Sequence, residues 1–133
     1  MANAVFPKGL QAFLAGNADW DANDIRVLLV RSTYTYDSAD EFVADLGAVD
    51  NGRSAALTGK TTTDGVADAD DTSLTATAAV ACNALVVFVH TGSDATARLL
   101  AYIDTATGLP FTPAASQVVN IAWDNGPNKI FKL

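Results

Sequence analysis

The sequence predicts a mainly β protein, an antiparallel β-sandwich or barrel-like domain with two short helices in its N-terminal third. After residue 51 the chain holds short apolar stretches separated by Gly, Pro, Asn and Asp. No helical periodicity interrupts them, so we expect successive strands joined by short turns. The chain is predicted to form one domain over residues 1–133, with a helical segment at 1–20 and a β body at 21–133.

The first helix is predicted within residues 6–20, with a length of about 8 to 10 residues. Pro7 suits a first helical turn and Gly16 suits a helix end. Polar residues 19–24 indicate a turn. The apolar residues that share one side of this helix at 3.6-residue spacing are Phe6, Leu10, Phe13 and Leu14.

Residues 25–36 predict a central strand, because they are rich in β-branched and aromatic side chains and are apolar on both sides. Ser38 and Glu41 then have the spacing of a capping box. Together with Phe42 and a closing Gly47, they predict a short second helix.

The remaining two thirds of the chain predict strands, which brings the total to between six and eight. Residues 84–90 and 98–104 form the clearest pair, a hairpin around Gly92-Ser93-Asp94. Residues 105–116 carry Gly and Pro and predict a loop. The other expected strands lie at 53–63, 65–69 and 74–79, and the chain closes with a hairpin of 119–123 and 130–133 around a turn at 124–128.

The composition excludes several classes of function. The chain has 133 residues, a net charge of −7 and one cysteine. An acidic surface repels phosphate, so no nucleic-acid or membrane partner is expected. One cysteine cannot form an internal disulfide. The N-terminal stretch lacks the basic start of a secretory signal, and the longest apolar run has the length of a strand.

Two short motifs resemble ligand sites but lack key residues. Gly59-Lys60-Thr61 matches the end of a phosphate-binding loop, but the first Gly of that motif would fall at Ser54. An acidic stretch also fails the EF-hand pattern, because Ser73 stands where the loop requires Gly. A looser calcium site on this stretch stays open; its carboxylates are Asp64, Asp68, Asp70 and Asp71.

No combination of residues predicts catalysis. Cys82 and His90 fall on one predicted strand, eight positions apart, and an unbroken strand would separate them by about 26 Å. Such a distance excludes a nucleophile–base pair. We therefore expect no enzyme activity, no catalytic or metal-binding residues and no cofactor.

Nearly the whole chain resembles a family of small structural proteins from tailed bacteriophages. The likeness rests on several stretches in this order: FPKGLQAFLAG, DANDIRVLLVRSTYTYDSADEFVADL, ALTGKTTTDGVADADD, RLLAYIDTATGLPFTP and IAWDNGPNKIFKL. The likeness is in the sequence as a whole and not in catalytic motifs.

The resemblance implies a virion component, and a capsid decoration or cement protein fits best. Such a protein is made in the bacterial cytoplasm and binds the outer face of the major capsid protein shell, often as a trimer. The helical segment and the C-terminal strand are the candidate contact elements. Their candidate interaction residues are Phe6, Leu10, Phe13, Trp20, Phe131 and Leu133.

Two alternatives remain open. The chain could instead be a tail or head-to-tail connector component, present in few copies per particle. It could also be a carbohydrate-binding β domain, which needs exposed aromatic rings in a planar row. The sequence offers Tyr34, Tyr36 and Tyr102 for such a row, although we expect these rings to pack on the sheet.

Overall fold

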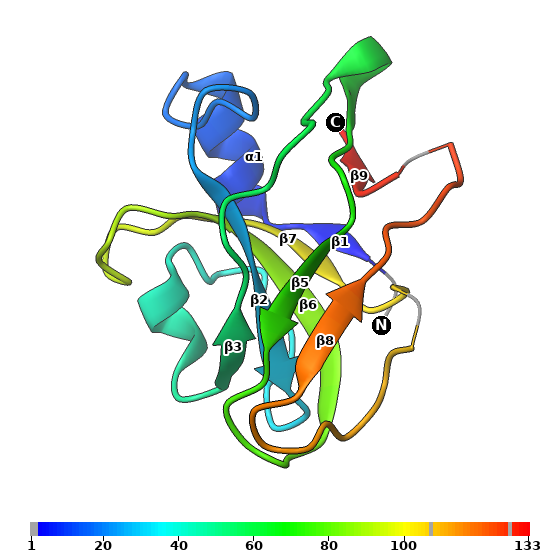
Figure 1. Cartoon of the computed structure of the whole chain (residues 1–133). Helices are drawn as coiled ribbons and strands as arrows, with labels where there is room; N and C mark the ends of the chain where they lie inside the picture. The colour runs from blue at the N-terminus through cyan, green and yellow to red at the C-terminus, as the bar shows by residue number, and fades with distance from the viewer. Residues whose placement is uncertain (1–2, 107, 128) are drawn as a thin grey trace.

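The computed structural model describes residues 3–106, 108–127 and 129–133 of the chain, and these form a mainly β, antiparallel structure (Figure 1). One α-helix is present in this part of the chain, α1 (Pro7–Leu14), with two 3-10 turns, η1 (Val43–Leu46) and η2 (Thr63–Gly65). The strands are β1 (Ala4–Val5), β2 (Ile25–Arg31), β3 (Asp50–Arg53), β4 (Val66–Ala67), β5 (Thr72–Thr75), β6 (Cys82–Val89), β7 (Leu99–Ile103), β8 (Val118–Ile121) and β9 (Phe131–Lys132).

Five strands form the main sheet in the order β1-β7-β6-β2-β3, with every neighbouring pair antiparallel. Its centre is the pair of β2 and β6, in register from Ile25 opposite Val89 to Val30 opposite Ala84. Both strands are almost entirely buried. Their continuous apolar runs reflect this burial on both faces.

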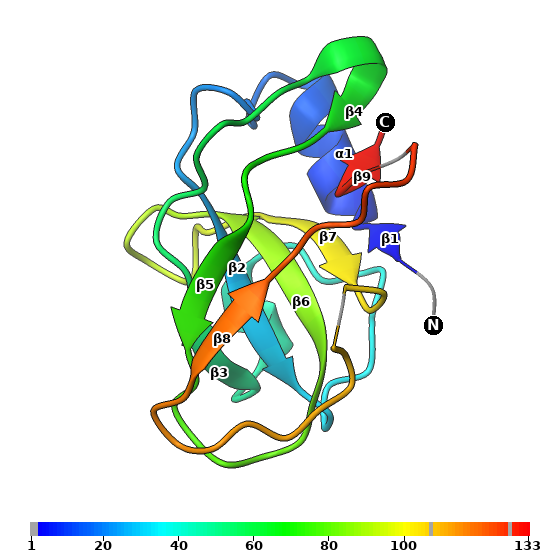
Figure 2. The ribbon, with the colours of Figure 1, turned by 45° about the vertical axis from the view of Figure 1, so that its right-hand side comes forward.

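Two smaller ribbons, β5–β8 and β4–β9, follow each other along one face of the main sheet (Figure 2). A single bridge between Ser54 and Leu74 joins the end of β3 to β5. This bridge links the sheet to the first ribbon, so the strands curl around a shared core. On the other side β1 and β9 lie near each other without pairing. The result is a partly open barrel, within the predicted class.

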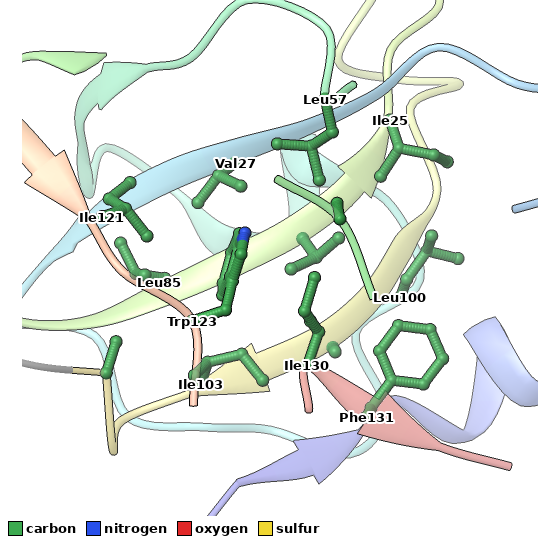
Figure 3. Close-up of a cluster of buried hydrophobic side chains, with 14 of the residues drawn as sticks. Ile25, Val27, Leu57, Leu85, Leu100, Ile103, Ile121, Trp123, Ile130 and Phe131 are labelled. Atoms are coloured by element: carbon green, nitrogen blue, oxygen red, sulfur yellow. The ribbon is translucent and has the colours of Figure 1, made fainter. Parts of the chain in front are cut away.

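The larger core fills the space inside this curl (Figure 3). Val27, Leu85 and Leu100 project from the main sheet toward Ile121 and Trp123 of the C-terminal third. The indole N–H of Trp123 donates to the carbonyl of Asp70 at 3.1 Å, so its polar edge is satisfied within the core.

A second, smaller core covers the outer face of the main sheet. Leu28 and Phe88 contribute from the sheet, while Val43 and Leu46 cover them from η1. Phe6, immediately before α1, is fully buried in this second core. The main sheet is therefore apolar on both faces.

Helix α1 lies directly on β7 because Gly9 lets the two backbones approach. A Cβ atom at Gly9 would come within 2.5 Å of the carbonyl oxygen of Leu99. Pro7 occupies the first helical turn, as predicted. Gly9 and Ala12 form the buried side of the helix.

Several predictions about the elements are confirmed. The first helix lies inside the predicted range 6–20 and has 8 residues. The hairpin of β6 and β7 matches the predicted strands 84–90 and 98–104 closely, and the two strands pair antiparallel. Strand β2 begins at Ile25 as expected but ends at Arg31, because a turn follows in which the amide of Tyr34 donates to the carbonyl of Arg31.

The second predicted helix does not form as an α-helix. The 3-10 turn η1 takes its place, and its N-cap is Phe42 and not Ser38. The carboxylate of Asp45 accepts hydrogen bonds from the backbone amides of Phe42 and Glu41, at 2.9 and 3.0 Å. These bonds lower the pKa of Asp45. A turn at Asp37, whose carboxylate accepts from the amide of Ala39, replaces the expected first helical turn.

The predicted strand at 53–63 and the predicted C-terminal hairpin are also wrong. Most of 53–63 is irregular, and the strand in this region is β3, which precedes it. The last two strands pair not with each other but with β5 and β4. Thr107 in the predicted loop 105–116 and Asn128 in the predicted turn 124–128 lie outside the described residues, as do Met1 and Ala2.

Candidate functional site: an apolar end surface

Helix α1 exposes an apolar stripe on the side away from β7. Leu14 is 83% exposed and Leu10 is 40% exposed. With Phe13 they occupy helical positions i, i+3 and i+4, which are neighbours on a helix surface. The stripe therefore presents a continuous apolar surface to solvent.

The stripe borders a pocket of about 340 Å³ between the end of α1, η2 and β9. The ring of Phe131 lies 6.0 Å from Phe13 and meets Trp20 edge-on at 5.3 Å. The indole N–H of Trp20 donates to the carbonyl of Asp68 at 3.2 Å, which fixes the orientation of the ring. The pocket thus has rigid aromatic walls.

The C-terminal residue completes this surface. Leu133 lines the same pocket and remains 54% exposed, while its amide donates to the carbonyl of Gly65 at 3.0 Å. We define the apolar end as the α1 stripe together with this pocket. Its residues are Leu10, Phe13, Leu14, Trp20, Phe131 and Leu133. Leu10, Leu14 and Leu133 are exposed, while Trp20 and Phe131 are buried and form the wall of the pocket. Exposed apolar side chains beside such a pocket are a candidate surface for binding another molecule.

The structure gathers most of the predicted interaction residues here, although they come from opposite ends of the sequence. Phe13, Trp20, Phe131 and Leu133 line one pocket, and Leu10 lies on the adjoining stripe. Phe6 does not belong to this surface. It is fully buried, with its ring 5.1 Å from that of Tyr36 on the outer face of the main sheet. Its contacts hold the fold together.

Leu14 is the residue that the list of candidates missed. It has the highest exposure among the large hydrophobic side chains in the described part of the chain. The helical spacing placed it on the same side as Leu10, so the signal was present in the pattern. What the pattern could not show is how far this side turns away from β7.

The Gly59-Lys60-Thr61 segment forms a turn in which its lysine is already bound. Lys60 Nζ donates to the backbone carbonyl of Asn23 at 2.6 Å. Gly59 has a positive φ of 63° and its Cα lies against Asp70, where a Cβ would come within 2.5 Å of the carboxylate carbon. The segment therefore joins neighbouring loops through specific contacts.

The predicted acidic stretch is used for internal hydrogen bonds. Asp71 accepts from the amide of Trp123 at 3.0 Å, and Asp70 accepts from the hydroxyl of Thr58 at 3.3 Å. Within residues 3–106, 108–127 and 129–133, His, Cys, Asp and Glu side chains form no group of three arranged to hold a metal ion.

Cys82 is the first residue of β6 and His90 directly follows the last, so the strand separates them as the spacing predicts. The Cys82 thiol is buried, and the loss of solvent raises its pKa. The amide of Asn51 donates to its sulfur at 3.3 Å. A raised pKa disfavours the thiolate that a nucleophile needs.

The three tyrosines pack against one another on the second core. Ring centroids lie 6.1 Å apart for Tyr34 and Tyr102 and 5.4 Å apart for Tyr36 and Tyr102, with the planes tilted by 49° and 54°. Tyr34 and Tyr102 are buried. This arrangement gives no planar row of exposed rings for a sugar.

Comparison with protein-family models, curated protein sequences and solved structures gives no significant match for this chain. Among the described residues, the helices also include none with the length and apolar character needed to cross a bilayer.

Proposed function

We propose that this chain is a bacteriophage virion structural protein that decorates the capsid by binding the outer face of the major capsid protein shell. The observation that carries the proposal is the apolar end, where Leu14 and Leu133 remain exposed beside an aromatic pocket. A surface of this kind is suited to binding a protein partner. The resemblance to small tailed-phage structural proteins expected from the sequence is the reason for proposing the major capsid protein as that partner.

The arrangement of the fold supports such a role. Two cores hold a β body in which the pocket walls are fixed by packing and by the bond from Trp20 to Asp68. A preformed surface loses little entropy when it binds. Many copies on one lattice, or a trimer that presents three such surfaces, would add avidity to a modest contact. We propose that the chain acts by this binding alone and not as an enzyme.

The first experiment measures the amount of this chain in purified particles relative to the major capsid protein, by quantitative mass spectrometry. A decoration protein is expected at an abundance close to that of the shell subunit. A handful of copies would identify a tail or connector component instead. Absence from the particles would contradict any virion role.

The second experiment tests the surface. Particles stripped of the chain are incubated with the purified protein, with the variant Leu14→Asp, or with Val118→Asp as the matched control. Val118 is also an exposed apolar side chain, 59% exposed, but it lies on β8 and outside the apolar end. Leu14→Asp is expected to lose binding at least tenfold, because a charge in an apolar contact costs more than about 1.4 kcal/mol. Equal binding of both variants would contradict docking through the apolar end.

A further inference from the structure

A second cavity, of about 250 Å³, separates the first strand of the fold from the last. Among the strands of the described residues, β1 is an outer strand of the main sheet whose partner is β7, and β9 has β4 as its partner. The two strands are neighbours with the cavity between them (Figure 2). The cavity is therefore bordered by two strand edges.

Strand β1 directs backbone hydrogen-bonding groups into this cavity. The amide of Phe6 donates to the carbonyl of Leu100 at 2.9 Å, and Ala4 lies opposite Tyr102. Alternate residues of an antiparallel strand direct their N–H and C=O groups to opposite sides. Ala4 therefore faces β7 as Phe6 does, and the N–H and C=O of Val5 point away from β7, toward the cavity.

Strand β9 shows the same pattern on the opposite border. The amide of Leu133 donates to the carbonyl of Gly65 at 3.0 Å, so Leu133 faces β4 and, by alternation, so does Phe131, which lies opposite Ala67. The alternation breaks just before the strand, where the amide of Ile130 also donates to the carbonyl of Ala67, at 3.1 Å. Lys132, which lies opposite Val66, is then the residue whose N–H and C=O point away from β4. Both borders thus present one donor and one acceptor of the kind that a further strand would satisfy.

The cavity also carries positive charge in a chain of net charge −7. Lys129 and Lys132 line it, and among the described residues neither is in an ion pair. Three of the arginines, by contrast, have carboxylate partners. Asp124 also lines the cavity, so the two lysines outnumber a single carboxylate there. One oxygen of that carboxylate accepts from the amide of Gly126 in its own turn.

We propose that an extended, acidic segment of a partner protein inserts between β1 and β9 and adds a strand there. Its backbone would bond Val5 on one side and Lys132 on the other. Alternate side chains would point inward, over the apolar residues Ile103 and Phe131, and outward, where carboxylates meet Lys129 and Lys132. The occupant is therefore a strand of alternating apolar and acidic residues. This inference concerns a surface whose lining shares only Phe131 with the pocket of the apolar end, and it holds or fails independently of the virion assignment.

The test uses a fluorescent hexapeptide of alternating valine and aspartate, and a block peptide with three valines followed by three aspartates. Binding is measured by anisotropy, and amide hydrogen exchange is followed by NMR. The alternating peptide is expected to bind more tightly and to slow exchange at the amides of Val5 and Lys132. Equal binding of the two peptides, or protection confined to the apolar end, would overturn the proposal.

Charge variants test whether the peptide binds in this cavity between β1 and β9 or is attracted only by the overall charge of the protein. Lys129→Glu and Lys132→Glu are each expected to weaken binding by up to about fivefold. Lys8→Glu, an equal charge change on α1, is expected to leave it unchanged. If all three variants weaken binding equally, the peptide is attracted by the net charge of the protein and the cavity between β1 and β9 is not its site.

A backbone variant tests the strand geometry directly. Val5→Pro removes an N–H that faces the cavity and spares the bonds between β1 and β7, so the protein is expected to fold but to bind at least fivefold more weakly. Ala4→Pro is the control, since it removes a donor that faces β7 and should destabilise the fold. Unchanged binding by folded Val5→Pro, or sedimentation showing a second copy of this chain in the cavity, would contradict the proposed occupant.

Discussion

Strand β3 is polar but buried at its centre, whereas the apolar end is hydrophobic but partly exposed to solvent. Strand β3 has the sequence Asp-Asn-Gly-Arg, yet Asn51 is fully buried and the following Ser54 is 3% exposed. At the apolar end, leucines remain in solvent. The difference teaches that burial follows from the partners a group finds. Polar groups can be buried where each has a hydrogen-bond partner, and we propose that the exposed leucines are covered when another molecule binds.

The partners of Asn51 show how a polar residue can sit in a core. Its side-chain nitrogen donates to the carbonyl of Ala78 and to the sulfur of Cys82. Its side-chain oxygen accepts from the amide of Ala78 and the hydroxyl of Thr77. The side chain thereby replaces a strand partner for the loop that leads into β6.

The largest effect is expected from Asn51→Ala, which removes the four hydrogen bonds made by a fully buried side chain. We expect the free energy of unfolding to fall by about 3 kcal/mol. The control Thr77→Val removes one of these hydrogen bonds and should cost about 1 kcal/mol. Urea denaturation measures both. A loss no greater than that of the control would show that the polar strand does not depend on this network.

Arg53→Met is expected to have an intermediate effect. The guanidinium of Arg53 makes two hydrogen bonds to Asp94, at 2.8 and 2.9 Å, a third to Asp50 at 2.6 Å, and lies 5.4 Å from the ring centre of Phe88. We expect a loss of about 1 to 2 kcal/mol, because the groups are partly exposed. Arg26→Met removes an exposed pair with Asp24 and should cost less than about 1 kcal/mol.

The stability lost in the Arg53→Met variant is also expected to depend on pH. The hydrogen bonds from Arg53 lower the pKa of Asp94 below its ordinary value. A carboxyl group with a lowered folded-state pKa stabilises the protein above its unfolded pKa of about 3.9, and this contribution is lost as the pH falls through the folded-state value. The stability difference between wild type and Arg53→Met should therefore shrink below about pH 4. Urea titrations from neutral to acidic pH that show a constant difference would contradict this origin.

The smallest effect on stability is expected at the apolar end. Leu14→Asp should change the free energy of unfolding by less than about 0.5 kcal/mol, since the side chain is mostly in solvent already. Ala12→Asp, on the buried side of the same helix, should cost several times more. Thermal denaturation compares them. Similar losses for the two variants would mean that Leu14 belongs to the fold and not to a binding surface.

The sequence predicted those parts of the fold in which local pattern and burial agree. The apolar runs of β2, β6 and β7 and the proline-led start of α1 are features of this kind. Strand β3 was missed because Asn51 and Ser54 are held by side-chain bonds to residues far along the chain, and no local pattern reports such bonds. The C-terminal hairpin was mispredicted because the strands that pair with β8 and β9 lie far earlier in the chain, where no local pattern indicates them.

The candidate surface was predicted in a similarly partial way. The amphipathic helix and the last strand were both expected to present apolar residues, and the structure brings the two segments to one pocket. The periodicity alone could not tell which side of α1 faces β7. That choice depends on the small size of Gly9 and Ala12, which let the helix approach the sheet. Phe6 precedes the helix and points to the opposite face of the sheet.

The pairings that close the barrel also determine how the chain must fold. Ala4 lies opposite Tyr102, and Val66 lies opposite Lys132, so these contacts join segments distant in sequence. Such contacts must overcome a large loss of chain entropy before they contribute stability, which places refolding on a timescale of about milliseconds to seconds. During that interval the hairpin of β6 and β7 can form early while its apolar faces still lack cover. A newly made chain is most prone to aggregate at this stage, before the strands that pair last have covered the hairpin.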